Sequence, residues 1–381
     1  MKTRIIGLDL DQPFSQLTVY SEASREPETV STTGEGQEFL IPTPKELFAL
    51  VRRESKEATG HLVNYLRRCF GLLKSETDPA GITLCVTMRE MKPAWIRTIQ
   101  EAAGRLGIGR LSLQTHRESF FAYMVNQKKV LWQHKVVLFE YEEQEIRAYV
   151  FSADYQTRPA LVTVTEADKT RMSHKNGKNH RGEEGRKDQL FFELIQRVFQ
   201  KDSVSCVYLI GEGFEGGWMN ESLNFLCRKR HVFQGSNLYT KGACYTAMAR
   251  AGISSALNAF LYRSEDLVET NLSMQMSVKG RQKNQLLVSA GRNWYETEGS
   301  CELLLDDEEE LVIYSKSMMD GTVSSYSIAL PDLPKRPPRT TRLELKFCYT
   351  AANRCRVTIR DLGFGVFFPS SGLRWESELE V

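Results

Sequence analysis

Three short segments of the chain carry residue types that could contact a phosphorylated ligand. Residues 7–10 place Asp9 near the end of an apolar run, residues 210–213 read Ile-Gly-Glu-Gly, and residues 241–243 read Lys-Gly-Ala. Glycine suits such a site because backbone N–H groups can then approach anionic oxygens closely. The same glycines equally suit a tight turn between a strand and a helix. The segments therefore indicate a candidate site for a phosphorylated ligand and leave its use open.

The remaining reactive side chains do not form a recognisable catalytic or metal site. The eight cysteines include no Cys-x-x-Cys pair, and several lie in apolar runs, as Cys85 and Cys206 do. This pattern favours buried free thiols in a reducing cytosol. The six histidines lack zinc-finger spacing. His61 and His116 are isolated, which is typical of structural histidines, and no Ser/His/Asp or Cys/His arrangement is present.

Length, charge and hydropathy set broad limits on the kind of protein. The 381 residues exceed one typical core and suit two or three domains. A net charge of +2 gives no general attraction to nucleic acids or membranes. No stretch approaches the roughly 20 apolar residues of a membrane span, and the N-terminal apolar run is too short for a secretory signal. These features predict a cytoplasmic globular protein.

The first two thirds of the chain alternate predicted strands and helices, which is typical of an α/β sheet domain. Strands are predicted at residues 4–10, 16–20, 82–87, 111–113, 136–141, 146–152, 204–210 and 231–233. Helices are predicted at residues 93–106, 118–125, 189–199, 220–230 and 242–250. We expect the last helix to continue toward residue 261 with a break near Gly252.

A further helix start is predicted at residues 43–46. Thr43 can cap the helix, Pro44 suits its first position, and Glu46 completes a capping box. Apolar residues then recur at helical spacing up to residue 66. Gly60 is predicted to divide this region into two helices.

Residues 168–187 interrupt the alternating pattern with basic residues and almost no apolar content. The basic residues are Lys169, Arg171, Lys175, Lys178, Arg181, Arg186 and Lys187. This composition predicts a flexible surface loop. The alternative is a loop that binds a polyanion, but the stretch lacks the interleaved aromatic residues of single-stranded nucleic-acid sites.

Beyond residue 266 the apolar period changes from helical to two, which predicts strands. They are expected at residues 272–278, 285–290, 301–305, 311–315, 325–330, 342–349 and 355–361. Turn residues separate these strands at short intervals. We therefore expect a second, all-β domain that forms a sandwich.

The order of these segments resembles that of the DnaK-type heat-shock chaperones, members of the actin-like ATPase superfamily. The first segment resembles their first phosphate motif, residues 136–140 the second phosphate strand, residues 210–213 the adenosine motif, and residues 237–243 the closing helix. Residues 330–361 resemble the end of their peptide-binding sandwich. No single motif is specific, but their shared order spans two dissimilar domains.

The resemblance implies an actin-like two-lobed, ribonuclease-H-like ATPase fold with reduced outer subdomains at residues 1–262. Lobe I would span about residues 1–132 and lobe II about residues 133–262. A C-terminal β-sandwich that resembles a chaperone peptide-binding domain would occupy residues 263–381.

The resemblance also implies site residues and a cofactor, ATP or ADP with Mg²⁺. Nucleotide binding would fall to the matching positions Gly211, Glu212, Gly213, Lys241 and Gly242. Asp9 could hold a metal-bound water, while Glu118 and Glu140 could position a metal or a hydrolytic water. We favour structural, capping or solvated roles for these three carboxylates and assign no catalytic residue. Lys241 equally suits a solvent-facing helix start.

Two departures from the family pattern argue against phosphate chemistry. Where the family has a glycine and two hydroxyl residues, this chain has Asp11, Gln12 and Pro13. A carboxylate repels phosphate, and proline lacks an N–H donor. In the second motif an aspartate and a glycine run are replaced by residues 140–144, Glu-Tyr-Glu-Glu-Gln. The family's lysine for phosphoryl transfer has no assignable counterpart in the short first lobe.

The predicted function is therefore protein or peptide interaction by a degenerate DnaK-like protein, a pseudo-ATPase. No membrane or nucleic-acid partner is expected. One alternative is a nucleotide-dependent chaperone-like ATPase, and another is an actin-like structural or assembly protein. Residues 272–278 and 285–290 are candidate peptide-pocket strands, although their alternating apolar residues equally suit the sandwich core. The sequence indicates neither the client nor the oligomeric state.

Overall fold

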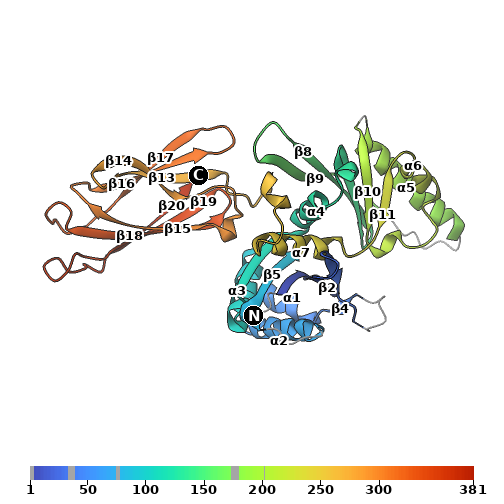
Figure 1. The fold of residues 1–381 in the computed structure, drawn as a ribbon, viewed down its shortest axis with the longest axis horizontal. Coiled ribbons are helices and arrows are strands. Elements are labelled where there is room, and N and C mark those ends of the chain that lie inside the picture. Colours follow the sequence, from blue (N-terminus) through green and yellow to red (C-terminus); the bar gives the residue numbers. More distant parts are fainter. Residues whose placement is uncertain (1–3, 33–38, 74–77, 173–179, 201) are drawn as a thin grey trace. The chain divides into compact units, whose positions relative to one another are not determined.

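The computed structural model describes residues 4–32, 39–73, 78–172, 180–200 and 202–381. The chain divides into two compact units, Met1–Arg263 and Ser264–Val381. Figure 1 shows the helices and strands of each unit. In the described part of the chain, no helix is both long and apolar enough to cross a membrane.

The first sheet of the first unit has the strand order β3-β2-β1-β5-β6, with β4 paired to β2. These strands are β1 (Arg4–Asp9), β2 (Phe14–Tyr20), β3 (Pro27–Thr29), β4 (Ile41–Pro42), β5 (Ile82–Met88) and β6 (Arg110–Thr115). β5 is buried along its whole length, as its apolar sequence predicts. The nearby helices are α1 (Lys45–Arg52), α2 (Ala58–Gly71) and α3 (Pro93–Leu106).

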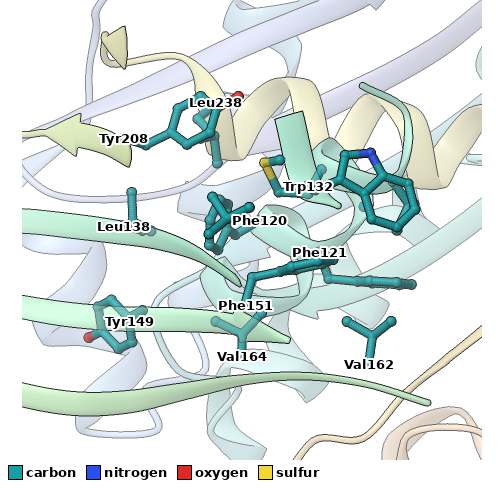
Figure 2. Packing of buried hydrophobic residues seen from close by; sticks show 14 of the residues in the cluster. Phe120, Phe121, Trp132, Leu138, Tyr149, Phe151, Val162, Val164, Tyr208 and Leu238 are labelled. Atoms are coloured by element: carbon teal, nitrogen blue, oxygen red, sulfur yellow. The ribbon is translucent and has the colours of Figure 1, made fainter. Parts of the chain in front are cut away.

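The second sheet of this unit has the order β11-β10-β7-β8-β9-β12. Its strands are β7 (Lys135–Glu142), β8 (Glu145–Asp154), β9 (Ala160–Arg171), β10 (Val204–Ile210), β11 (His231–Gln234) and β12 (Phe260–Tyr262). Figure 2 shows how Phe120 and Phe121 of α4 (His116–Val125) pack with Phe151 and Val164 of this sheet. A second apolar cluster joins the sheet to α5 (His180–Phe199) and α6 (Asn220–Leu226).

The two sheets of the first unit repeat one topology. In each, three antiparallel strands follow one another, β1-β2-β3 and β7-β8-β9. In each, two later strands lie parallel to the first strand on its other side, β5-β6 and β10-β11. The helix α7 (Leu238–Arg250) packs on β1 and β5 and against α4. This duplication of mixed α/β sheets agrees with the two-lobed actin-like architecture that the sequence predicts.

The second unit contains two four-stranded antiparallel sheets, ordered β14-β13-β16-β17 and β15-β18-β19-β20. Their strands are β13 (Thr270–Val278), β14 (Arg281–Val288), β15 (Glu298–Leu305), β16 (Glu310–Ser317), β17 (Val323–Ala329), β18 (Thr341–Ala351), β19 (Arg354–Asp361) and β20 (Arg374–Glu380). Both sheets contribute buried residues to one apolar core, including Ile313 and Phe347. The predicted sandwich is therefore present, while its likeness to a chaperone domain stays a prediction.

Three local predictions in the first unit are wrong. Gly60 lies inside α2, and the break between α1 and α2 comes earlier in the chain. Thr43 does not cap α1, because its hydroxyl donates instead to the carbonyl of Asp11 at 2.7 Å. The last helix does not continue toward residue 261. It ends at Arg250, the predicted break does fall at Gly252, which adopts a φ of +77°, and one short 3₁₀ helix, Ala256–Ala259, precedes β12.

The basic stretch predicted as a surface loop belongs largely to regular structure. Its first residues complete β9, where Lys169 and Arg171 pair in register with Arg147 and Glu145 of β8. Its last residues begin α5, whose later turns bury Phe191 against the sheet. Residues 173–179 lie outside the described residues. Backbone pairing and the apolar half of the helix therefore override the local basic composition.

Candidate interlobe site

The candidate site forms where strand ends of the two sheets meet the helices α4 and α7. Asp9 closes β1, Arg89 follows β5 directly, and Glu140 lies near the end of β7. His116 opens α4, and Tyr239 lies in the first turn of α7. The contacts below connect these side chains into one network.

Asp9 and His116 form a buried pair within this network. His116 Nε2 donates to Asp9 Oδ1 at 2.8 Å, and both residues are buried. The imidazole stacks on the ring of Tyr239 with a centroid distance of 4.0 Å. Burial lowers the pKa of His116, but the charge of Asp9 and its hydrogen bond outweigh that effect, so the pKa is raised. The pair therefore favours an imidazolium bound to a carboxylate.

Arg89 joins carboxylates from both lobes. Its guanidinium lies 3.4 Å from Asp11 Oδ2, 3.3 Å from Glu140 Oε2 and 2.5 Å from Glu142 Oε2. The hydroxyl of Tyr239 donates to Glu140 Oε1 at 3.0 Å. Both oxygens of Glu140 are thus engaged by side chains of the protein itself.

The electrostatics of the network oppose a phosphorylated ligand. Four carboxylates face two cationic side chains, Arg89 and His116, so the site keeps an excess of negative charge. Burial raises the pKa of Asp11 and of Glu142, although the charge of Arg89 lowers both. A triphosphate placed here would add more negative charge to a site in which Asp11 and Glu142 already resist ionisation.

Close packing explains the glycines assigned to nucleotide binding. Gly211 has a φ of +113°, and a Cβ on it would lie 2.0 Å from the carbonyl oxygen of Tyr141. A Cβ on Gly213 would lie 2.4 Å from the ring of Tyr141. A Cβ on Gly242 would lie 2.0 Å from the carbonyl oxygen of Ser119, where α7 crosses α4. All three positions need glycine for contacts within the protein.

The other predicted site residues take different positions. Glu212 is exposed in the short 3₁₀ turn after β10, and Lys241 is half-buried in α7. Glu118 is half-buried in the first turn of α4, where its backbone N–H bonds to the Thr115 hydroxyl. The network therefore brings together only Asp9 and Glu140 of the residues assigned from the sequence.

Sequence reasoning missed Arg89, His116 and Tyr239 as members of the network. One signal could have found Arg89, since it follows a fully buried parallel strand whose carboxyl end lies beside that of β1. No local signal marks Tyr239. His116 was interpreted as an isolated structural histidine, and the structure places it as the buried partner of Asp9.

The residues present do not fit a magnesium–nucleotide complex. Among the residues that the structure describes, no group of three or more His, Cys, Asp or Glu side chains is arranged to hold a metal ion. Asp9 is already bound by His116, and Arg89 occupies oxygens of the acidic groups nearby. Tyr141 fills the space beside the glycine turn.

The fold defines the class of the protein: a two-lobed α/β unit with a duplicated sheet topology, followed by a β-sandwich. Within that class, the chain belongs to the family of unknown function DUF5716, whose C-terminal model matches residues 44–265 and so more than half of the chain. Residues 267–381 match a second model, the domain of unknown function DUF8552.

Two of the solved structures that a comparison matched to this chain are sugar kinases. The inorganic polyphosphate/ATP-glucomannokinase from Arthrobacter sp. strain KM is 10% identical with a TM-score of 0.40, covering 65% of this chain and 100% of that chain. The ROK hexokinase from Thermus thermophilus is 12% identical with a TM-score of 0.36, covering 66% and 100%. A search of curated proteins found no match. Similarity at this level assigns no activity, and the DnaK-like subtype stays a prediction.

Proposed function

We propose that this protein does not hydrolyse nucleotides and acts by binding a protein or peptide partner. In this proposal the ion pairs of the interlobe site hold the two lobes together. We call Arg89 and its partners Asp11, Glu140 and Glu142 the lock. The observation that carries it is the position of Arg89, which contacts Asp11 of one lobe and Glu140 and Glu142 of the other.

The energetics of the lock support this proposal. A nucleotide with magnesium would have to displace Arg89 from the carboxylates and leave the buried carboxylate of Glu140 without its cation. Breaking a fully buried ion pair costs about 3–5 kcal/mol, and the cost here is lower because the Arg89 side chain is 30% exposed. The glycines that could accept a ligand are in contact with Tyr141, so binding would also require the turn after β10 to move.

The lock connects the lobes directly. Arg89 comes from the first sheet, while Glu140 belongs to the second. Tyr239 of α7 stacks on His116 and donates to Glu140, so it contacts both ends of the network. A rigid first unit would then leave partner binding to exposed surfaces of the chain, and the β-sandwich is one such surface.

Isothermal titration with ATP and Mg²⁺, combined with a phosphate-release assay, tests the proposal. We expect no saturable heat and no phosphate release above buffer. The variant Asp9→Asn should behave as the wild type does in both assays. Tight binding with steady phosphate release that Asp9→Asn abolishes would overturn the proposal in favour of a chaperone-like ATPase.

A further inference from the structure

The loop between β19 and β20, residues 362–373, presents an apolar tip to solvent. Val366 and Phe367 are 93% and 92% exposed, and Phe364 is 46% exposed. None of the twelve residues in this loop is charged. Adjacent, fully exposed apolar side chains are costly in water, and a contiguous apolar patch marks an interaction site.

A buried ion pair holds this loop in shape. Asp361 at the loop's base accepts two hydrogen bonds from Arg336, at 2.9 and 2.8 Å, and its side chain is completely buried. Ser371, at the far end of the loop, donates to the same carboxylate from its backbone and its hydroxyl at 2.8 and 2.7 Å. Gly363 also donates to it at 2.9 Å. A preorganised tip loses little conformational entropy when it binds.

An acidic groove lies at the same end of the sandwich. The register pairs Leu305 with Thr341 and Leu343 with Asp361. The last residues of β15 and β19 therefore lie at the same end of the sheet, and the loops that follow them begin there. The groove has a volume of about 880 Å³. Its acidic lining residues are Asp306, Asp307, Glu308, Glu309, Glu310 and Asp332. Its apolar lining includes Leu330 and Leu333.

The segment between β17 and β18 contacts both the groove and the base of the loop that carries the apolar tip. Arg336 lines the groove and also donates to the carbonyl of Pro369 at 2.8 Å. Arg339 donates to the carbonyl of Leu305 at 2.9 Å and pairs with Asp306 at 3.4 Å. Asp361 neutralises Arg336, Arg339 pairs with Asp306, and Lys335 adds one further cation. The six acidic residues that line the groove therefore remain in excess.

We propose that this end of the β-sandwich, the apolar tip with the adjoining acidic groove, docks an amphipathic protein segment rich in Lys and Arg. This inference rests on the proposed function, partner binding, and names the chemistry of the partner. The tip supplies apolar contact area, and the acidic groove selects cationic side chains by charge complementarity. The same acidic run repels anionic lipid and nucleic acid.

Fluorescence anisotropy with the full chain tests the docking surface. The probes are labelled synthetic peptides with identical leucine positions, whose polar positions are all lysine, all glutamine or all glutamate. We expect saturable binding of the lysine peptide that weakens with added salt, and no binding of the glutamate peptide. Removing both tip side chains, Val366→Ser with Phe367→Ser, should weaken binding by at least about tenfold, because the apolar area that these two side chains would bury on binding is lost.

Matched variants separate the tip from the groove and from general effects. Glu308→Gln with Glu309→Gln should reduce the salt dependence while leaving binding of the glutamine peptide unchanged. The controls Met318→Ser, an exposed apolar side chain beyond the other end of β16, and Glu298→Gln, at the start of β15, should bind as the wild type does. Circular dichroism should show every variant folded, because the substituted side chains are exposed.

Two outcomes would overturn the inference. One is binding of the lysine peptide that the double tip variant leaves unchanged, or no binding of it by the wild type. The other is sedimentation with phosphatidylcholine vesicles that requires Phe367, which would make the tip a lipid contact. ATP turnover in the separate phosphate-release assay would refute the proposed function but would not change the peptide-binding result. The two failures are therefore distinguishable.

Discussion

Acidic groups of both lobes converge on the side chain of Arg89. Arg89→Met should lower the free energy of unfolding by about 2 to 3 kcal/mol, because Glu140 is left buried without its cation. The expected loss lies below that of a fully buried pair, since the Arg89 side chain is 30% exposed. Urea unfolding measures this change. Small-angle X-ray scattering should show a larger radius of gyration for the variant, because the ion pairs that join the lobes are lost.

The matched control is Arg97→Met in α3. Arg97 also pairs with a carboxylate, Glu54, but both side chains are more than half exposed. Its substitution should change stability by less than about 0.5 kcal/mol. Equal effects of the two substitutions would show that Arg89 is an ordinary surface arginine and that the lobes are not locked by it.

His116 makes stability depend on pH. Its pKa is raised above the ordinary value of 6.5, so the folded state holds the proton more tightly than the unfolded chain. The resulting stabilisation is fully present below about pH 6.5 and is lost as the pH rises through the raised pKa. The free energy of unfolding of the wild type, relative to that of His116→Gln, should therefore fall as the pH rises from about 6.5 through the raised pKa of His116.

The comparison with a variant isolates this effect from other groups of the site. Asp11 and Glu142 also have raised pKa values, but the ordinary pKa values of these carboxyl groups, 3.8 and 4.5, are lower than that of histidine. Their titration therefore affects stability at acidic pH. His61→Gln serves as a control because it removes a histidine of α2, outside the network. Parallel pH profiles for wild type and His116→Gln would contradict the assigned pairing with Asp9.

The turn after β10 is the element whose sequence suggested nucleotide binding. Gly211→Ala should destabilise the fold by about 2 kcal/mol or more, because the φ of +113° disfavours a side chain and the new Cβ would meet the carbonyl of Tyr141. Gly60→Ala in α2 meets nothing within 4 Å and should stabilise by about 0.5–1 kcal/mol. Thermal unfolding compares them, and an unchanged midpoint for Gly211→Ala would show that the turn adapts freely.

Elements with a strong apolar period could be predicted closely from the sequence. The bounds of α3 and β10 agree with the expectation, because each buries one apolar face or run locally. β9 and β20 were missed because their outer halves are charged or exposed and they are held by pairing with neighbouring strands. Pairing of that kind is not visible in a local window.

The site could be predicted only in part, for a related reason. Asp9 and Glu140 follow recognisable buried strands, so their positions at strand ends are readable. Their partners are distant: His116 lies 107 residues from Asp9, and Arg89 lies 51 residues from Glu140. Contacts over such separations depend on how the sheets assemble. The sequence therefore indicated negative charge that would repel a phosphate at the site. It could not reveal that Arg89 neutralises part of this charge.

At the scale of the whole molecule, the chain consists of two units with separate cores. The contact-based division falls after Arg263, and the two family models meet between residues 265 and 267. The first unit holds the duplicated sheets and the lock, and the second holds the sandwich and the proposed docking surface. The two proposals can therefore be tested on different parts of one chain.

The separate core predicts that residues 264–381 fold alone. Both sheets of the sandwich close on one apolar cluster in which Leu343, Leu345 and Val357 are fully buried. We expect the isolated unit to show a β-type circular dichroism spectrum and a single cooperative urea transition. Within it, Phe347→Ala should cost about 3–5 kcal/mol, whereas Leu304→Ala, at a 46% exposed position, should cost far less. A fragment without a cooperative transition would show that the sandwich depends on the first unit for its fold.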